Sequence, residues 1–245
     1  MKKFLLLVVP ILSLIACSNE ELIPNVENNQ LQEIQQKYEA TKSNARINFG
    51  GLAAVISGHN TSRSESSPMT GNDYVQFLAS LPKEKVDSLY EIYCTPSMEA
   101  TYENNIDIVE QALIDNSSIE EVQALYNFTD SYIQSGGHNM TLLINESQQV
   151  SPLISDCMVI SAATIDEFIL DNSDYRLATS HCIRDLYVKL VEMYTGNVIA
   201  EGVCSWLAAV PGLDALTQLV MAGCDLYSAI KLAHEYNICC ATSVS

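Results

Sequence analysis

Apolar residues recur at the spacing of an α-helix along most of the chain after Asn72, and this periodicity limits the fold more than any other feature. One such stripe, at four- and three-residue intervals, comprises Tyr102, Ile106, Val109 and Leu113. The positions between the stripes are polar and often acidic, as expected for helices that bury one face and expose the other. The sequence therefore predicts an all-α protein built as a helical bundle.

Residues that start and stop helices divide the first part of this region. Proline suits the first turn of a helix, a serine followed by a glutamate suits a capping box, and paired glycines end a helix. Such residues are Pro82, Thr95-Pro96, Ser117-Ser118-Ile119-Glu120 and Gly136-Gly137. We therefore expect an N-terminal helical bundle over residues 73–137. The looser stretch 138–155 is expected to be a linker, in which Met140 to Ile144 could form a short strand.

A second group of helices is expected over residues 156–245. Helical periodicity returns from Ile160 to Leu170, and again after Asp174, a predicted N-cap, as far as a stop at Gly196. The last third is nearly apolar on all sides, apart from a break at Pro211-Gly212. A helix that is apolar all round is usually buried at the centre of a bundle. These residues are therefore predicted to form a cysteine-rich helical subdomain, which either meets the first bundle at the linker or continues it.

Residues 17–72 differ from the rest in composition and are expected to form a largely flexible tether. They are rich in Asn, Gln, Glu and Ser, which is typical of loops and linkers. One polar helix is expected near residues 28–43, from the helical spacing of Leu31, Ile34 and Tyr38. The apolar, glycine-bearing patch from Phe49 to Ile56 is able to pack back onto the body.

The N-terminus combines the features that direct a chain to export. Met1-Lys2-Lys3 is basic, Phe4 to Ile15 is almost wholly apolar, and a small residue precedes Cys17. This pattern predicts a secretory signal peptide over residues 1–16, too short to span a membrane as a mature helix. The last four positions, Leu14-Ile15-Ala16-Cys17, resemble the lipobox of bacterial lipoproteins. The resemblance implies that Cys17 receives a diacylglyceryl group, with acyl chains such as palmitate, and anchors the protein to a membrane.

A short acidic segment follows the cysteine. Ser18-Asn19-Glu20-Glu21 resembles the export signal that some Gram-negative lipoproteins use to reach the outer face of the outer membrane. The alternative is a solvated acidic linker. Under the first interpretation the protein is lipid-anchored in the outer membrane and either periplasmic or exposed at the cell surface.

The whole chain is strongly acidic. Thirty Asp and Glu residues face twelve Lys and Arg residues, which gives a formal net charge of −18. So acidic a surface argues against nucleic acid as a partner, because the phosphate backbone would be repelled. A charge that keeps an exported protein soluble is the simplest interpretation, and it leaves an unknown protein or small molecule as the partner.

Cysteine is concentrated at the C-terminal end. Apart from Cys17 and Cys94, the cysteines are Cys157, Cys182, Cys204, Cys224, Cys239 and Cys240. An even set of six in an exported chain predicts disulfides that staple the C-terminal helices, with a pairing that the sequence does not assign. The adjacent Cys239 and Cys240 are expected to bond to different partners, because a bond between neighbours strains the backbone. The alternative is that most of the six are buried free thiols, since cysteine packs as a small apolar residue.

Residues with defined catalytic or metal-binding spacing do not occur in the sequence. A zinc-protease helix, a serine nucleophile elbow and a dinucleotide-binding glycine pattern are all absent. Asp166-Glu167, Asp171 and Asp174 are acidic, but the stretch lacks the glycine and the final glutamate of a calcium-binding loop. We therefore predict no catalytic residue, no metal site and no cofactor.

Two combinations of histidine and cysteine are weaker candidates for chemistry. His181-Cys182 could be a thiolate–imidazole nucleophile, and His234 with Cys239 and Cys240 could hold a soft metal ion. Neither combination has the spacing of a defined site. Neighbours on a helix also point about a hundred degrees apart, so His181 and Cys182 are not expected to meet. A surface histidine beside a bridged cysteine is the favoured interpretation.

These observations predict a membrane-tethered envelope or surface lipoprotein with a non-enzymatic binding or structural role. One alternative is a secreted antagonistic protein with membrane-active C-terminal helices. The arrangement of Cys204, Pro211-Gly212, Cys224 and Cys239-Cys240 in an apolar region resembles the cysteine-stapled helical peptides of the halocin-type bacteriocins. The other alternative is an enzyme of an unrecognised family, for which a pocket with converging ionisable groups would be the evidence.

Overall fold

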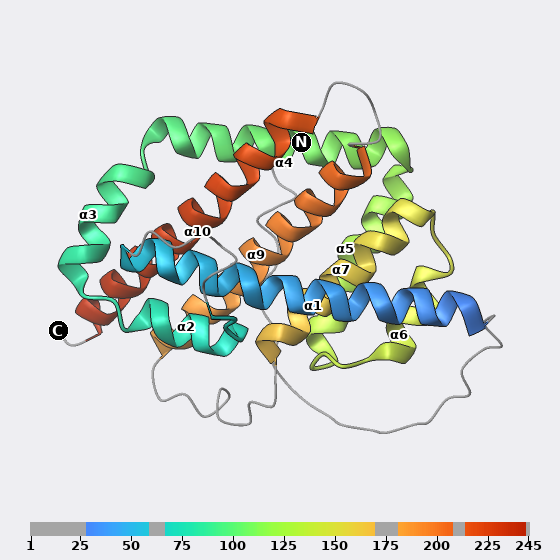
Figure 1. The fold of residues 1–245 in the computed structure, drawn as a ribbon, viewed down its shortest axis with the longest axis horizontal. Coiled ribbons are helices and arrows are strands. Elements are labelled where there is room, and N and C mark those ends of the chain that lie inside the picture. The colour runs from blue at the N-terminus through green and yellow to red at the C-terminus, as the bar shows by residue number, and fades with distance from the viewer. Residues whose placement is uncertain (1–27, 59–66, 170–180, 208–213, 244–245) are drawn as a thin grey trace.

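The computed structural model describes residues 28–58, 67–169, 181–207 and 214–243, and the regular structure in these ranges is entirely α-helical. In chain order the helices are α1 (Asn28–Ser57), α2 (Gly71–Ala79), α3 (Lys83–Tyr93), α4 (Pro96–Asn116), α5 (Ile119–Gln134), α6 (Met140–Ser147), α7 (Pro152–Ile169), α9 (His181–Leu207) and α10 (Asp214–Thr242). Figure 1 shows α9 and α10 side by side, with α1 crossing them. The predicted all-α bundle is confirmed.

Several sequence predictions concern residues outside the described ranges. They are the signal peptide, Cys17, the acidic segment 18–21, the N-cap Asp174 and the break at Pro211-Gly212. The side chain of Cys204 also lies outside the described part, although its backbone belongs to α9.

Polar side chains cap several helices by accepting a hydrogen bond from a backbone N–H of the first turn. The caps are Thr70 of α2 (3.1 Å to Asp73 N), Thr95 of α4 (3.3 Å to Met98 N), Ser118 of α5 (3.2 Å to Glu121 N) and Asn139 of α6 (3.0 Å to Leu142 N). Each such cap contributes about 1 kcal/mol by satisfying a donor that the helix leaves unpaired. Proline follows Thr95 at the first position of α4, as the sequence predicted.

The capping box expected at residues 117–120 is only half formed, and it is displaced by one residue. Ser118 is the N-cap, so the box would be completed by Glu121. The Glu121 carboxylate instead accepts a hydrogen bond from the backbone N–H of Ser151, just before α7. One side chain therefore joins the start of α5 to the start of α7. At the other end of α5, Gly136 and Gly137 have φ of 85° and 72° and stop the helix, as predicted.

Helix α7 is the centre of the described core. Every side chain from Cys157 to Phe168 is buried, so the helix is enclosed on all sides. Its neighbours include α1, α5, α6 and α9. The sequence analysis placed the last helices at the centre, but the described part of α10 still exposes Ile238 by 51 %. Enclosure of α7 matters for the site because α7 carries two of the buried acidic residues.

Helix α1 belongs to the folded body, so the prediction of a flexible tether is wrong for residues 28–57, whereas the helix expected near residues 28–43 is confirmed and continues to Ser57. Many of its apolar side chains are buried in the core, among them Ile34, Tyr38, Phe49, Leu52 and Ile56. The chain just before α2 passes close to the backbone of α1 at Gly50. A Cβ atom at this position would lie 2.0 Å from the carbonyl oxygen of Ser67, so only glycine fits here. The Asn, Gln and Glu residues that suggested a tether mostly lie on the solvent side of this helix.

The stretch 138–155 is not a linker between two subdomains. Met140–Ser147 forms α6 rather than a strand, and Leu143 and Ile144 are buried. One continuous core contains residues from α1 through α10, which corresponds to the alternative of a single bundle. Helix α9 continues through Gly196 to Leu207, so the predicted stop at Gly196 is also wrong. Within the described ranges, no helix combines the length and the apolarity needed to cross a bilayer.

Candidate functional site

A disulfide joins the two C-terminal helices near the surface. Cys182 is the second residue of α9, and Cys239 lies in the last turns of α10. Because the two helices run antiparallel, these ends meet, with the two Cα atoms 5.7 Å apart. The bond spans 57 residues of sequence, a loop for which the chain-entropy model gives about 4 kcal/mol of stabilisation. It therefore holds the α9–α10 pair together where the pair ends.

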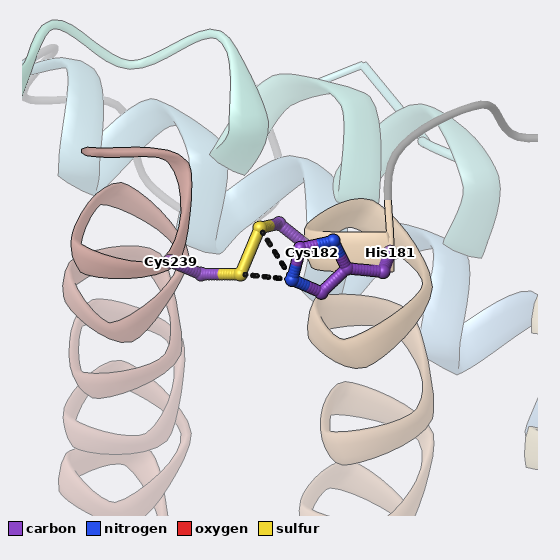
Figure 2. A group of neighbouring side chains, drawn as sticks. All are labelled: His181, Cys182 and Cys239. Atoms are coloured by element: carbon purple, nitrogen blue, oxygen red, sulfur yellow. Dashed lines mark hydrogen bonds between the residues drawn. A yellow bond between two sulfur atoms is a disulfide. The ribbon is translucent and has the colours of Figure 1, made fainter. Parts of the chain in front are cut away.

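His181 completes a cluster with the two bonded cysteines, here called the disulfide cluster. Its Nε2 atom lies 3.6 Å from Cys182 Sγ and 3.4 Å from Cys239 Sγ, as Figure 2 shows. The expectation that His181 and Cys182 would not meet is wrong. His181 is the first residue of α9, so no preceding turn of that helix restricts its side chain. The imidazole instead lies across the end of α9 toward α10.

The disulfide cluster is accessible to solvent on one side. His181 is exposed and Cys239 is partly exposed, whereas Cys182 is 1 % exposed. A small pocket beside the bond is lined by Asp185, Lys189, Glu235 and Tyr236 together with the two cysteines. While the bond is closed, neither sulfur is a thiolate, so the cluster offers neither a nucleophile nor a thiolate ligand.

The predicted disulfide staple is confirmed for one pair, Cys182 and Cys239, but the prediction that all six cysteines are bridged is wrong, because Cys157 and Cys240 take part in no disulfide. Cys157 and Cys224 are buried, and Cys240 is partly buried. The physical reason is the one given for the alternative: a cysteine packs as a small apolar group, as Cys157 does in the interior of α7. Cys94, which lies outside the set of six, is a free thiol and partly buried.

Thiol reactivity should rank these cysteines by their surroundings. Burial raises the pKa of the Cys157 thiol to about 12 and that of Cys94 to about 11, so both stay protonated near neutral pH. Treating the native protein with iodoacetamide at about pH 8 should therefore modify Cys240 first, Cys94 slowly and Cys157 not at all, because the thiolate is the reacting form. Peptide mass spectrometry gives the order. Rapid modification of Cys157 in the folded protein would contradict the burial described here, and modification after denaturation is the control.

His234 does not join Cys239 and Cys240. Its ring stacks on Tyr90 of α3, with ring centroids 3.9 Å apart, and its Nε2 lies 3.6 Å from an oxygen of Asp87. The soft metal set of His234, Cys239 and Cys240 is therefore not formed among the described residues. His234 is close to Cys239 and Cys240 in the sequence, but its side chain packs against α3 and not against these cysteines.

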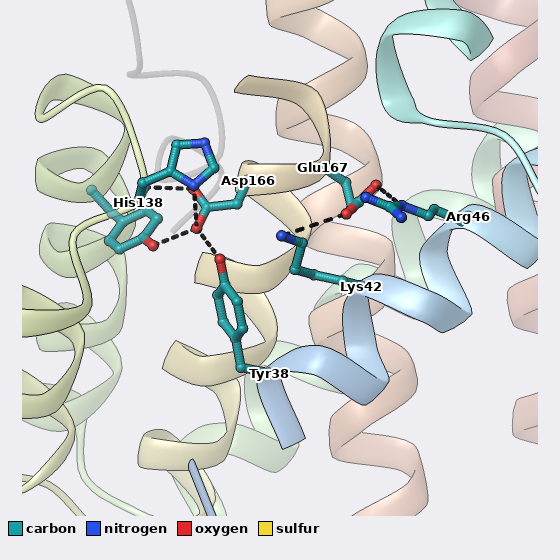
Figure 3. A network of polar contacts seen from close by, with 7 residues as sticks. Tyr38, Lys42, Arg46, His138, Asp166 and Glu167 are labelled. Atoms are coloured by element: carbon teal, nitrogen blue, oxygen red, sulfur yellow. Dashed lines mark hydrogen bonds and ion pairs between the residues drawn. The ribbon is translucent and has the colours of Figure 1, made fainter. Parts of the chain in front are cut away.

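A second group of polar residues is buried around Asp166 of α7. Asp166 is fully buried, and its carboxylate accepts hydrogen bonds from the hydroxyls of Tyr38 and Tyr132 and from the backbone N–H of His138 at 2.8 Å (Figure 3). The His138 Nδ1 atom lies 3.6 Å from Oδ2 of Asp166, and the imidazole ring is half-exposed. His138 has φ of 52°, so the turn after Gly137 is what aims its N–H at the carboxylate.

The two tyrosines act as fixed donors in this group. Burial and the hydrogen bond to Asp166 raise the pKa of Tyr38 and of Tyr132 well above the usual value. Both hydroxyls therefore remain protonated over the physiological range and keep donating to the carboxylate. The buried carboxylate of Asp166 therefore has its hydrogen-bond partners supplied by three separate segments of the chain.

Glu167, the next residue, is held by two cations of α1. Its carboxylate is fully buried, with Arg46 Nε at 2.7 Å and Lys42 Nζ at 3.8 Å. Lys42 and Arg46 are one helical turn apart, so they approach the same carboxylate from one face of α1. The hydrogen bond to Glu167 raises the pKa of Arg46, so the guanidinium remains charged.

A third buried carboxylate, Asp225 of α10, is held by amides. Asn48 of α1 donates to one oxygen at 3.0 Å and to the hydroxyl of Tyr194 at 2.9 Å. Asn197 of α9 donates to the other oxygen at 3.0 Å. All three buried acids therefore receive a donor from α1.

Sequence reasoning noticed Asp166-Glu167 only as acidic residues without a calcium loop. The donors come from segments far apart in the chain, and no spacing rule brings them together. The one local signal was the polar stripe of α1, whose members are Tyr38, Lys42, Arg46 and Asn48. Tyr38 and Lys42 lie on the helix expected near residues 28–43, but that helix was interpreted as part of a tether and not of the core.

Comparisons with protein-family models, with curated proteins and with solved structures found no match to this chain. The function therefore has to be argued from the site. The buried acids are engaged by donors of the chain itself, and a reacting group instead needs access to a substrate. Among the residues that the structure describes, the disulfide cluster combines two sulfur atoms and an imidazole with access to solvent.

Proposed function

We propose that this chain is a membrane-tethered envelope lipoprotein whose helical body has a non-enzymatic binding or structural role. Cys17 is the proposed site of lipidation, and the partner is an unknown protein or small molecule. The proposed location is the outer membrane, with the body in the periplasm or at the cell surface. Nucleic acid is not a proposed partner, because a net charge of −18 opposes it.

The observation that carries this proposal is the segment Leu14-Ile15-Ala16-Cys17 after a basic start and an apolar stretch. A buried methylene of an acyl chain contributes about 0.8 kcal/mol, so attachment by more than one chain is durable. The body then needs no apolar surface of its own to stay at the membrane. Its acidic surface suits a soluble domain that is held near the membrane by lipid alone.

Two features of the body support the proposal. The disulfide between Cys182 and Cys239 suits an oxidising compartment, where such bonds persist. The buried carboxylates of Asp166 and Asp225 each accept hydrogen bonds from several donors of the same chain, and that of Glu167 accepts one from Arg46 and pairs with Lys42. Acids held in this way specify how helices pack, which favours a structural role for them over a catalytic one.

Mass spectrometry of the native protein extracted from membranes without reduction tests the proposal. We expect an N-terminal peptide that begins at Cys17 and carries a diacylglyceryl group. Replacing Cys17→Ala should abolish the lipid and release the protein from the membrane fraction. Cys94→Ala is the matched control, because this thiol lies in the helical body and should leave both properties unchanged. An unmodified Cys17 in membrane-extracted protein would contradict the proposal. Released C-terminal fragments would favour the antagonistic alternative instead.

A further inference from the structure

The disulfide cluster contains a histidine in addition to the two bonded cysteines. A disulfide requires two cysteines, yet an exposed imidazole lies against both sulfurs. The three ligand atoms, His181 Nε2, Cys182 Sγ and Cys239 Sγ, all lie within 4.8 Å of one another. Imidazole nitrogen and thiolate sulfur are the ligands that zinc prefers in proteins. The question is therefore what these three side chains do before the bond forms or after it is reduced.

We propose that His181, Cys182 and Cys239 form a zinc-type metal site when the two cysteines are reduced, so that metal binding and the disulfide exclude each other. The proposal goes beyond the lipoprotein role and does not depend on it. The fourth coordination position is open to water, because His181 is exposed to solvent.

The distances fit this ligand set. In a tetrahedral zinc site with Zn–N near 2.0 Å and Zn–S near 2.3 Å, a ligand nitrogen lies about 3.5 Å from each ligand sulfur. The observed separations from His181 Nε2 are 3.6 Å to Cys182 and 3.4 Å to Cys239. Two sulfurs that share a zinc ion lie about 3.8 Å apart, which side-chain rotation can reach once the bond is cut. The imidazole is therefore already placed, and only the sulfurs have to separate (Figure 2).

The chemistry balances in both directions. The newly made chain has two thiols, and an oxidant of the disulfide class takes two electrons and two protons from them, which forms the Cys182–Cys239 bond and leaves the oxidant as a dithiol. In competition, Zn²⁺ binds the two thiols as thiolates with neutral His181 and releases two protons. A dithiol reductant would reverse the first reaction and make the ligands available again. No electron passes to the metal at any step.

Two histidines allow a matched test. His181 lies against both sulfurs, whereas His234, five residues before Cys239, stacks on Tyr90. The full-length chain is reduced with a phosphine without oxygen, dialysed and titrated with Co²⁺ as a spectroscopic probe and with Zn²⁺ in competition. We expect one Co²⁺ per reduced chain, with thiolate-to-cobalt charge-transfer absorption, and none per oxidised chain.

The variants then separate the site from the other thiols. His181→Gln should weaken Co²⁺ binding at least about a hundredfold, because loss of a ligand exceeds the ten- to hundredfold loss seen for its supporting partners. His234→Gln and Cys240→Ser should bind as the unsubstituted chain does. Equal affinity of the two histidine variants would overturn the proposal, and so would a reduced chain that binds no Co²⁺.

Alkylation gives a second measurement that does not depend on spectra. Zn²⁺ should protect Cys182 and Cys239 from iodoacetamide in the reduced chain, and His181→Gln should remove that protection. Circular dichroism follows whether reduction alters the helices. A reduced chain that loses helix and regains it with Zn²⁺ would support the site, since metal binding then couples to folding. A chain that loses helix and does not respond to Zn²⁺ would refute it.

Discussion

Replacing Phe49→Ala is expected to lower the free energy of unfolding by about 3–5 kcal/mol, the range seen when a buried phenylalanine is truncated. Phe49 is fully buried on α1. Its ring lies 5.0 Å from the ring of Tyr74, 5.1 Å from that of Phe168 and 4.6 Å from that of Tyr194. One side chain therefore joins α1 to α2, α7 and α9, and its removal leaves a cavity among four helices.

The experiment is urea unfolding followed by the helical circular dichroism signal. Val55→Ala is the matched control, because Val55 lies in the same helix but is 48 % exposed, so its truncation should change stability by less than about 0.5 kcal/mol. The loss of unfolding free energy should therefore be much larger for Phe49→Ala than for Val55→Ala. If Phe49→Ala were as mild as Val55→Ala, α1 would behave as the tether that composition suggested rather than as part of the core.

The sequence allowed prediction of those parts of the fold that follow local rules. Helical periodicity identified the stripes of α3 to α5, and Thr95-Pro96 and Gly136-Gly137 marked helix ends that the structure contains. Such features depend on residues within a turn or two of each other, so they can be recognised without knowing the fold. The all-α class follows from the same periodicity.

Composition gave a wrong prediction for α1, because this helix has a polar face toward solvent and an apolar face toward the core. The N-terminal segment was interpreted as a tether because Asn, Gln and Glu dominate it, yet these residues mostly lie on the solvent side of α1. Its inner face supplies Phe49 to the core and Tyr38, Arg46 and Asn48 to the buried acids. A weak apolar stripe is enough for burial when polar residues beside it find partners in the core.

The candidate sites depend on contacts that sequence cannot supply. Tyr38 and Asp166 are separated by 128 residues, and Cys182 and Cys239 by 57. The cysteine count suggested disulfides but not which sulfurs would meet, because partner choice depends on where helices α9 and α10 end. The disulfide cluster also depends on His181 being the first residue of α9. Periodicity does not define the exact residue at which a helix begins.

Replacing Asp166→Ala should lower the free energy of unfolding by at least about 3 kcal/mol, because each buried donor left without an acceptor costs about 1–3 kcal/mol. Three donors lose their acceptor: the hydroxyls of Tyr38 and Tyr132 and the N–H of His138. The substitution also removes the anion that joins α1, α5 and the turn after α5 to α7. Tyr38→Phe removes one donor and keeps the others, so its effect should be smaller, about 1–2 kcal/mol.

Asp107→Ala is the control for this measurement, because Asp107 is an exposed acid in the middle of α4 and its loss should change stability by no more than about 0.5 kcal/mol. Urea unfolding of the three variants should therefore rank them as Asp166→Ala, Tyr38→Phe and Asp107→Ala. A stable Asp166→Ala protein would mean that the carboxylate does not hold these helices together. A buried acid with no structural value would then need a functional explanation, and the non-enzymatic role proposed for the body would lose one of its supports.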